Sequence, residues 1–145
     1  MLSHLIGFHP SFSALTLRIV LGLIFIAHGA EKLFKHKPKG VSDYFQSLGI
    51  PAPMFFAYVV TCTEFLGGMF LLAGLLTRWA AAALSIEMLV ALVTVRFKTG
   101  LISRTTPGGS VGGYELEFAL SAMAFVLVIL GAGKFSVDWI AFQVW

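Results

Sequence analysis

The chain has 145 residues, of which 58% are hydrophobic and only 12% are charged, and its mean hydropathy is +0.90. Soluble domains are about 45–50% apolar and about 25% charged, so the composition excludes an ordinary soluble protein and predicts an integral membrane protein. The net charge of +3 does not indicate nucleic-acid binding, because the basic residues lie in loops and at helix ends, where they orient a membrane protein.

Four long apolar segments carry most of the hydrophobic excess. A membrane-spanning helix needs about 20 apolar residues, so four spans fill more than half of the chain and leave no room for a soluble domain. We therefore expect an all-α fold, a single membrane domain over 1–145 that forms an antiparallel four-helix bundle. The predicted transmembrane helices are 14–34, 53–76, 79–97 and 114–132.

Two further features limit processing and redox chemistry. Residues 1–12 lack a basic region followed by a small-residue cleavage site, so we expect them to be retained and not removed as a signal peptide. Cys62 is the only cysteine, which excludes an intramolecular disulfide and a Cys-x-x-Cys pair. A lone cysteine in an apolar helix is most often a small core residue, and we expect Cys62 to be one.

The first predicted span, 14–34, ends in a polar cluster. His28, Glu31 and Lys32 lie three or four residues apart, so their side chains project from nearby parts of one helix surface. Small residues at the same spacing let another helix approach closely. The stripe with this spacing consists of Arg18, Gly22, Phe25, Gly29 and Lys32.

The connection that follows, 35–51, is basic at its start and then amphipathic. Its apolar residues recur at helical spacing, which predicts a short amphipathic helix lying on the membrane surface. Those residues are Val41, Tyr44, Phe45 and Leu48. Pro51 and Pro53 then end this helix and begin the second span.

Each later span carries a glutamate. Glu64 shares a face with Gly67 and Gly68, which predicts that it points towards a close helix contact. Glu87 lies in the middle of a stripe of alanines in the third span. Glu115 begins the fourth span on a face of small residues, Ala119 and Ala122. Glu117 is assigned to another side of that helix, near its start, where the helix dipole favours an acid.

Alternating helix directions bring most of these groups into the half of the domain next to the loops 35–52 and 98–113. An acid that faces lipid at the helix centre costs roughly 2.5–3.5 kcal/mol or more, so we expect the acids to face inward and to pair with basic groups. The candidate pocket residues are His28, Glu31, Lys32, Glu64, Glu87, Arg96 and Glu115.

The opposite end of the domain offers a different pair. Arg18 and Asp138 both lie there, and we expect a structural ion pair between them at the interface. Lysine and arginine are more numerous on the side of the two loops. The positive-inside rule therefore places that side in the cytoplasm and both termini in the periplasm.

The polar cluster has three interpretations: a latch that specifies the fold, a pocket for a small molecule, headgroup or proton, and a metal site. Carboxylate-bridged di-iron bundles use two Glu-x-x-His motifs, whereas the spans contain only His28, in a His-x-x-Glu arrangement. No second membrane histidine is present for a paired haem ligand. No haem, flavin or metal motif is recognisable, so a metal is not expected and the cofactor stays open.

Several short motifs, in their order and spacing, resemble the DoxX family of small four-helix bacterial membrane proteins. They cover nearly the whole chain, and the last more often contains a proline where Ala132 stands here. The motifs are His28-Gly29-x-x-Lys32-Leu33-Phe34, Leu48-Gly49-Ile50-Pro51, Glu64-x-x-Gly67-Gly68-x-x-Leu71-Leu72-x-Gly74-Leu75-x-Thr77-Arg78, Gly113-Tyr114-Glu115 and Gly131-x-Gly133-x-x-Ser136-x-Asp138.

The resemblance implies a multi-pass protein of the bacterial inner membrane, with His28, Lys32, Glu64 and Glu115 as pocket residues. Members of the family are linked to thiosulfate:quinone oxidoreductase, to membrane oxidoreductase complexes that deal with thiol stress, and to gene clusters for modified peptides. The resemblance therefore implies a link to oxidoreductases and leaves open whether this chain is itself catalytic.

The first hypothesis is a membrane subunit of a redox system that takes a quinone-sized or sulfur-containing ligand and works with a redox partner protein. Glu64 and His28 would exchange protons, while Lys32 and Arg96 would hold an anionic or carbonyl oxygen. The second is a non-enzymatic scaffold or a protein that binds a lipid or small molecule. The third is a small transporter, which would need to form a homo-oligomer.

Overall fold

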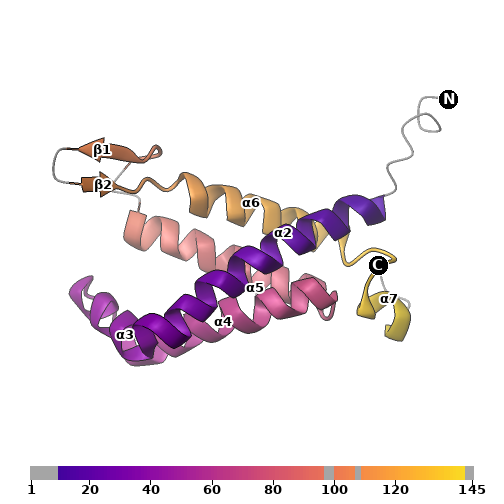
Figure 1. Ribbon diagram of the computed structural model, residues 1–145, viewed down its shortest axis with the longest axis horizontal. Helices are drawn as coiled ribbons and strands as arrows, with labels where there is room; N and C mark the ends of the chain where they lie inside the picture. The colour runs from indigo at the N-terminus through magenta and orange to yellow at the C-terminus, as the bar shows by residue number, and fades with distance from the viewer. Residues whose placement is uncertain (1–9, 97–99, 107–108, 143–145) are drawn as a thin grey trace.

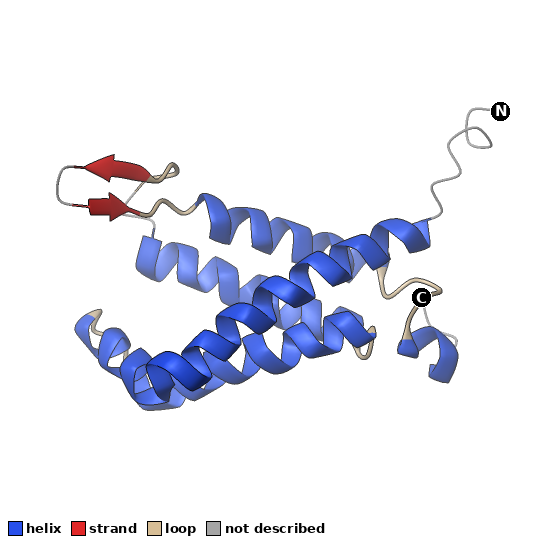
Figure 2. Cartoon of the chain, viewed as in Figure 1, coloured by secondary structure: helices blue, strands red, loops and turns tan. Residues whose placement is uncertain are grey.

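The computed structural model describes residues 10–96, 100–106 and 109–142, and the regular secondary structure of this part of the chain is helical apart from one short hairpin (Figure 2). The predicted lead-in 1–9 lies outside the described residues. The strands β1 and β2 pair antiparallel, with Thr105 opposite Ser110. The elements in chain order are α2 (Pro10–Ala30), η1 (Glu31–His36), α3 (Lys37–Ser47), α4 (Pro53–Ala73), α5 (Thr77–Ala91), η2 (Leu92–Arg96), β1 (Arg104–Thr106), β2 (Gly109–Val111), α6 (Glu115–Leu130) and α7 (Val137–Phe142).

Three helical segments of the described chain are long and apolar enough to cross a membrane: Ser11–Ser47, Pro53–Ala73 and Thr77–Val95. The first is longer than predicted, because the helix continues from α2 into α3 through the six-residue π-helix η1. Lys37 has a φ of 57°, so the backbone departs from helical geometry at the start of α3. Helix α6 has only 16 residues and is shorter than these three. The chain is therefore a membrane protein with several apolar helices in contact with the lipid bilayer.

The four long helices pack side by side: α2 lies against α4, α4 against α5, and α5 against α6. The start of α2 and helix α7 lie at one end, whereas α3 and the β hairpin lie at the other (Figure 1). This arrangement follows from the short connections, since three residues between α4 and α5 force them to run antiparallel. The described parts of the two connecting segments, α3 and the hairpin, therefore lie at one end, as the sequence predicts, although the basic stretch 35–39 is helical and not a loop.

Glycines bring α2 and α4 into backbone contact. A Cβ atom on Gly29 would lie 2.5 Å from the backbone nitrogen of Phe65, and one on Gly68 would lie 2.8 Å from that of Ile26. Gly22 meets the same helix at the carbonyl of Gly68. The predicted close approach along this stripe is confirmed, and it fixes which residues of the two helices face each other.

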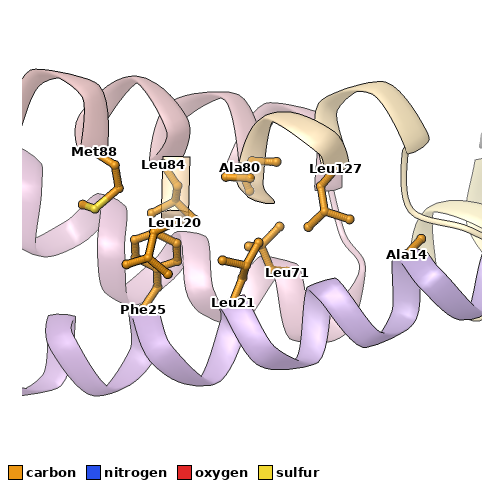
Figure 3. Close-up of a cluster of buried hydrophobic side chains, with 11 residues drawn as sticks. Ala14, Leu21, Phe25, Leu71, Ala80, Leu84, Met88, Leu120 and Leu127 are labelled. Atoms are coloured by element: carbon orange, nitrogen blue, oxygen red, sulfur yellow. The ribbon is translucent and has the colours of Figure 1, made fainter. Parts of the chain in front are cut away.

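The described residues form an apolar core where the four helices meet. Leu21 and Phe25 from α2, Leu71 from α4, Leu84 from α5 and Leu120 from α6 are buried and point towards one another (Figure 3). The outer surface is apolar as well, and it includes Cys62, which is exposed on α4 and not in the core as predicted. Position 62 lies directly after buried Thr61, one step off the stripe that faces the core. An apolar outer surface is what a helix in lipid requires.

Arg18 is buried in the end of the domain away from α3, with 1% of its surface exposed. Its guanidinium donates hydrogen bonds to the carbonyls at the end of α4, Leu71 (2.9 Å) and Leu72 (3.1 Å). It also donates to the carbonyls of Ala132 and Phe135 after α6, both at 2.8 Å. The side chain therefore joins the C-terminal end of α4 to the loop that follows α6 through four backbone carbonyls.

Asp138 acts on the same end of the domain from the start of α7. Its carboxylate accepts hydrogen bonds from the backbone N–H groups of Leu76 (2.7 Å) and Thr77 (2.9 Å). Among the described ion pairs none joins Arg18 to Asp138 within 4.0 Å, so the geometry differs from the predicted salt bridge. Both side chains bind backbone instead, because the helix ends between them offer exposed carbonyl and N–H groups.

Candidate functional site

A cavity of about 690 Å³ lies between the N-terminal half of α4 and the C-terminal half of α5. Four ionisable residues line it, one each from η1, α4, α5 and α6: Lys32, Glu64, Glu87 and Glu117. The rest of its lining is almost entirely apolar. Pockets of about 300–1,000 Å³ with apolar walls and a few convergent polar groups are typical of small-molecule sites.

Lys32 and Glu64 form an ion pair, with 2.6 Å between the lysine Nζ and the carboxylate Oε1. Lys32 follows Gly29 by one helical turn, and Gly29 packs directly on the backbone of Phe65. The glycine contact between α2 and α4 therefore places the two charges side by side. The Glu64 side chain is 3% exposed and that of Lys32 is 28% exposed, so the pair is shielded on the glutamate side.

Other carboxylate oxygens of Glu64 and Glu87 lack hydrogen-bond partners. Glu64 Oε2 and both carboxylate oxygens of Glu87 are buried and make no hydrogen bond with any described residue. Buried polar atoms normally have partners, and exceptions point to an ion, a water or a ligand. The polar part of the cavity therefore offers acceptor atoms that the chain itself does not use.

Glu117 lines the cavity, although the sequence analysis placed it on another side of its helix. That assignment followed the small-residue face of Glu115, on which Ala119 and Ala122 are exposed in the structure. The buried stripe of α6 runs instead through Leu120, Ser121, Ala124 and Leu127, three and four residues after Glu117. Two residues of this stripe are small, and Phe118 and Phe125 of the same helix are exposed, so the size of the residues gives no signal that would have found Glu117.

Glu115 lies outside the cavity and holds the base of the hairpin. Its Oε2 accepts a hydrogen bond from the backbone N–H of Ser103 at 2.9 Å. The Ser103 hydroxyl in turn accepts one from the N–H of Gly113 at 3.0 Å. The structure thus separates Glu115 from the other predicted pocket residues, because the first turn of α6 directs it to the loop and Glu117 to the cavity.

Two of the remaining candidates, Glu31 and His28, do not join Lys32, Glu64 and Glu87. Glu31 is exposed and bonds to Lys35 within its own helix, with 2.9 Å between Oε1 and Nζ. His28 is exposed and is absent from the cavity lining. Arg96 ends η2, and its side chain lies outside the described part of the structure. The sequence predicted that these groups gather near one end, but helix rotation turns Glu31 and His28 outward.

The cavity walls reach the outer surface of the protein. Phe56 and Val59 of α4 and Ile86 and Val90 of α5 all line the cavity, yet they are 40%, 42%, 61% and 54% exposed. Since the outer surface of these helices contacts lipid, the cavity opens sideways towards the bilayer.

In the described residues, no group of three or more His, Cys, Asp or Glu side chains has the arrangement of a metal site. The three glutamates of the cavity come from different helices, with the ammonium of Lys32 at one of them. What the site can do chemically is hold a polar head next to carboxylates while apolar walls hold the rest of the molecule.

The sequence model of the DoxX family matches residues 13–96, more than half of the chain. A Bacillus subtilis protein named "Putative oxidoreductase CatD" is 28% identical over 129 residues, which are 89% of this chain and 87% of that protein. An uncharacterized membrane protein of Mycobacterium tuberculosis is 31% identical over 135 residues, 87% of this chain and 79% of its own length. An uncharacterized protein of Haemophilus influenzae is 32% identical over 139 residues, 94% and 96% of the two chains. No solved structure matches. With its apolar helices and this match, the chain belongs to the DoxX family of membrane proteins.

Proposed function

We propose that this protein is the membrane subunit of a redox system and that its cavity binds a quinone-sized or sulfur-containing ligand. The observation that carries the proposal is the cavity of about 690 Å³, whose apolar walls open to the lipid-facing surface and whose polar end holds Lys32, Glu64 and Glu87. A quinone ring with an apolar tail matches both parts. The B. subtilis relative whose name describes an oxidoreductase supports the same class of function.

Three polar residues of the cavity, Lys32, Glu64 and Glu87, have roles in this proposal. The ammonium of Lys32, 2.6 Å from Glu64 Oε1, is placed to hold a carbonyl or anionic oxygen of the ligand. Glu64 and Glu87 would exchange the protons, and Glu87 takes the role that the sequence analysis gave to His28. Reduction of a quinone to a hydroquinone consumes two electrons and two protons. The protons pass through the carboxylates, and a partner protein that oxidises a sulfur compound supplies the electrons.

The membrane arrangement in this proposal is a four-helix transmembrane bundle in the bacterial cytoplasmic membrane. Helix α6 serves as the fourth span and α3 lies at the cytoplasmic interface. Both termini are in the periplasm, because the basic residues gather at the end that carries α3 and the hairpin. The cavity then lies in the cytoplasmic half of the bilayer.

Binding and turnover in lipid nanodiscs test the proposal. A decyl-substituted benzoquinone should bind the purified protein, and its reduction should require the co-purified partner and a sulfur donor. Lys32→Met should weaken binding about tenfold, because the oxygen of the ligand loses its cation. Glu31→Gln, which removes an exposed carboxylate outside the cavity, serves as the control. Absence of both quinone binding and turnover in the wild-type protein with its partner would overturn the proposal.

A second candidate function is that of a non-enzymatic scaffold. The Lys32–Glu64 ion pair favours this function, because the pair joins the α2–η1 helix to α4 beside the glycine contact. Buried ion pairs specify a fold in some proteins without taking part in chemistry. In that case Glu64→Gln would change thermal stability or assembly with partners and would leave quinone binding at the wild-type level.

A further inference from the structure

Several buried carboxylate oxygens of the cavity have no hydrogen-bond donor. The ammonium of Lys32 donates one of its three N–H bonds to Glu64 Oε1, with 2.6 Å between the atoms, and the hydroxyl of Thr94 donates to the carbonyl of Val90 at 2.7 Å. Glu64 Oε2 and both oxygens of Glu87 have no hydrogen-bond partner among the described residues, although all three are buried. Glu64 is 3% exposed, so bulk water does not satisfy its second oxygen. The free hydrogen-bonding capacity at these atoms is therefore acceptor capacity.

A ligand completes such a site only if its polar head supplies donors. A carboxylate accepts hydrogen bonds and donates none, and a buried acceptor without a donor is destabilising. A head group with O–H or N–H bonds restores these partners, whereas a head with only carbonyl or ether oxygens brings further acceptors. The apolar walls formed by Val59, Ile86 and Val90 require the rest of the molecule to be hydrocarbon.

We propose that the cavity selects amphiphilic ligands whose polar head donates hydrogen bonds, and that Glu87 is the acceptor that makes this selection. Glu87 has two partnerless oxygens, while Glu64 shares one of its oxygens with Lys32, so Glu87 discriminates more strongly between ligands. The inference rests on the cavity being a ligand site, as proposed above. It adds that the hydroxyl-bearing hydroquinone binds more tightly than the carbonyl-bearing quinone of the same tail.

A pair of non-redox probes separates the selection from any turnover. 4-Decylphenol and its methyl ether have nearly the same shape and tail, and only the phenol donates a hydrogen bond. Isothermal titration into nanodiscs containing the protein, with empty nanodiscs as the reference for lipid partitioning, gives both dissociation constants. For the wild-type protein we expect the phenol to bind about tenfold more tightly than the ether, as one hydrogen bond to a carboxylate warrants.

Variants assign the preference to Glu87. Glu87→Leu replaces the acceptor with an apolar side chain of similar size. In this variant the phenol and the ether should bind with about the same affinity. Glu87→Gln supplies both a donor and an acceptor, so it should also reduce the preference for the phenol over the ether. This second variant provides the test if the leucine variant does not fold. Thr16→Val is the matched control, because Thr16 lies on α2 outside the cavity lining and its hydroxyl donates to the carbonyl of Phe12 at 2.9 Å. This control should keep the wild-type preference.

The outcomes distinguish this inference from the proposed function. Equal binding of phenol and ether, or a preference that persists in both Glu87 variants, overturns the selection even if the quinone binds and turns over. Tighter binding of the ether also overturns it, since Glu87 would then be a protonated donor. A phenol preference that depends on Glu87, without quinone turnover, supports the selection and removes the redox function. Binding of neither probe overturns the selection together with the ligand site.

Discussion

Gly29 of α2 and Phe65 of α4 touch through their backbones, so closely that a Cβ atom on Gly29 would lie 2.5 Å from the nitrogen of Phe65 and 2.7 Å from its Cα. Such a distance leaves no room for any side chain larger than hydrogen. The contact lies one helical turn from Lys32 and one residue from Glu64, so helix packing and site geometry depend on the same few atoms.

Gly29→Ala should therefore force α2 and α4 apart and lower the free energy of unfolding by about 1–3 kcal/mol, as overpacking of a tight contact does. The melting temperature in detergent measures this loss. Gly40→Ala in α3 is the control, because a Cβ there would meet only His36 Cβ, at 3.7 Å. The control should be neutral or slightly stabilising, since alanine is the better helix former. An equal loss in both variants would contradict the role of the close contact.

Lys32→Met should leave the Glu64 carboxylate buried without a countercharge and destabilise the protein by up to about 3 kcal/mol, because a lone buried charge is costly. The double variant Lys32→Met with Glu64→Leu removes both charges and should recover much of this stability. A double-mutant cycle on chemical denaturation measures the coupling. If the losses of the two single variants simply add, the ion pair does not couple α2 to α4.

Arg18→Lys should destabilise the domain although it keeps the positive charge. Lysine cannot reproduce the planar fork with which the guanidinium binds the carbonyls of Leu71, Leu72, Ala132 and Phe135. We expect a loss of about 2 kcal/mol or more, since several buried acceptors lose their donor. Lys39→Arg, an exchange at an exposed residue of α3, is the control. Wild-type stability of Arg18→Lys would show that the charge alone is sufficient.

Glu117→Gln and Glu115→Gln should have different effects, although the two residues are close in sequence. Glu117 lines the cavity, so its variant should change the affinity for 4-decylphenol at least severalfold. Glu115 holds Ser103 at the hairpin base, so its variant should leave affinity unchanged and increase proteolysis of the segment 100–113. Titration and limited proteolysis measure the two effects. The reverse assignment of effects would support the pocket role that the family resemblance implies for Glu115.

The sequence predicted the helical fold from its long apolar segments. It predicted that Glu64 faces a neighbouring helix because glycine and glutamate share a stripe in the second span. Gly67 and Gly68 mark a close contact, and an acid on that face has to be buried with them. Glu117 was missed because residue size does not mark the core face of α6. Its buried stripe mixes large and small residues (Leu120, Ser121, Ala124 and Leu127), while Ala119 and Phe118 of the same helix are both exposed. A single helix does not show which of its faces the neighbouring helices will cover.

The sequence also did not predict that the first helix continues from α2 through η1 into α3. Lys35 to Lys39 look like a basic loop, but η1 and α3 keep them helical, and intrahelical contacts offset part of their repulsion: Lys35 with Glu31 and Lys39 with Asp43. Such i, i+4 pairs favour a helix over an open loop. Where that helix bends at Lys37 depends on tertiary packing against α4, which the local sequence does not encode.

Helices α4 and α5 are joined by the short turn of Gly74, Leu75 and Leu76, and Asp138 grips this turn through three backbone hydrogen bonds. The cavity lies towards the opposite ends of the same two helices. The three hydrogen bonds at the turn therefore help to fix the angle between α4 and α5, and with it the spacing of their far ends, where the cavity lies.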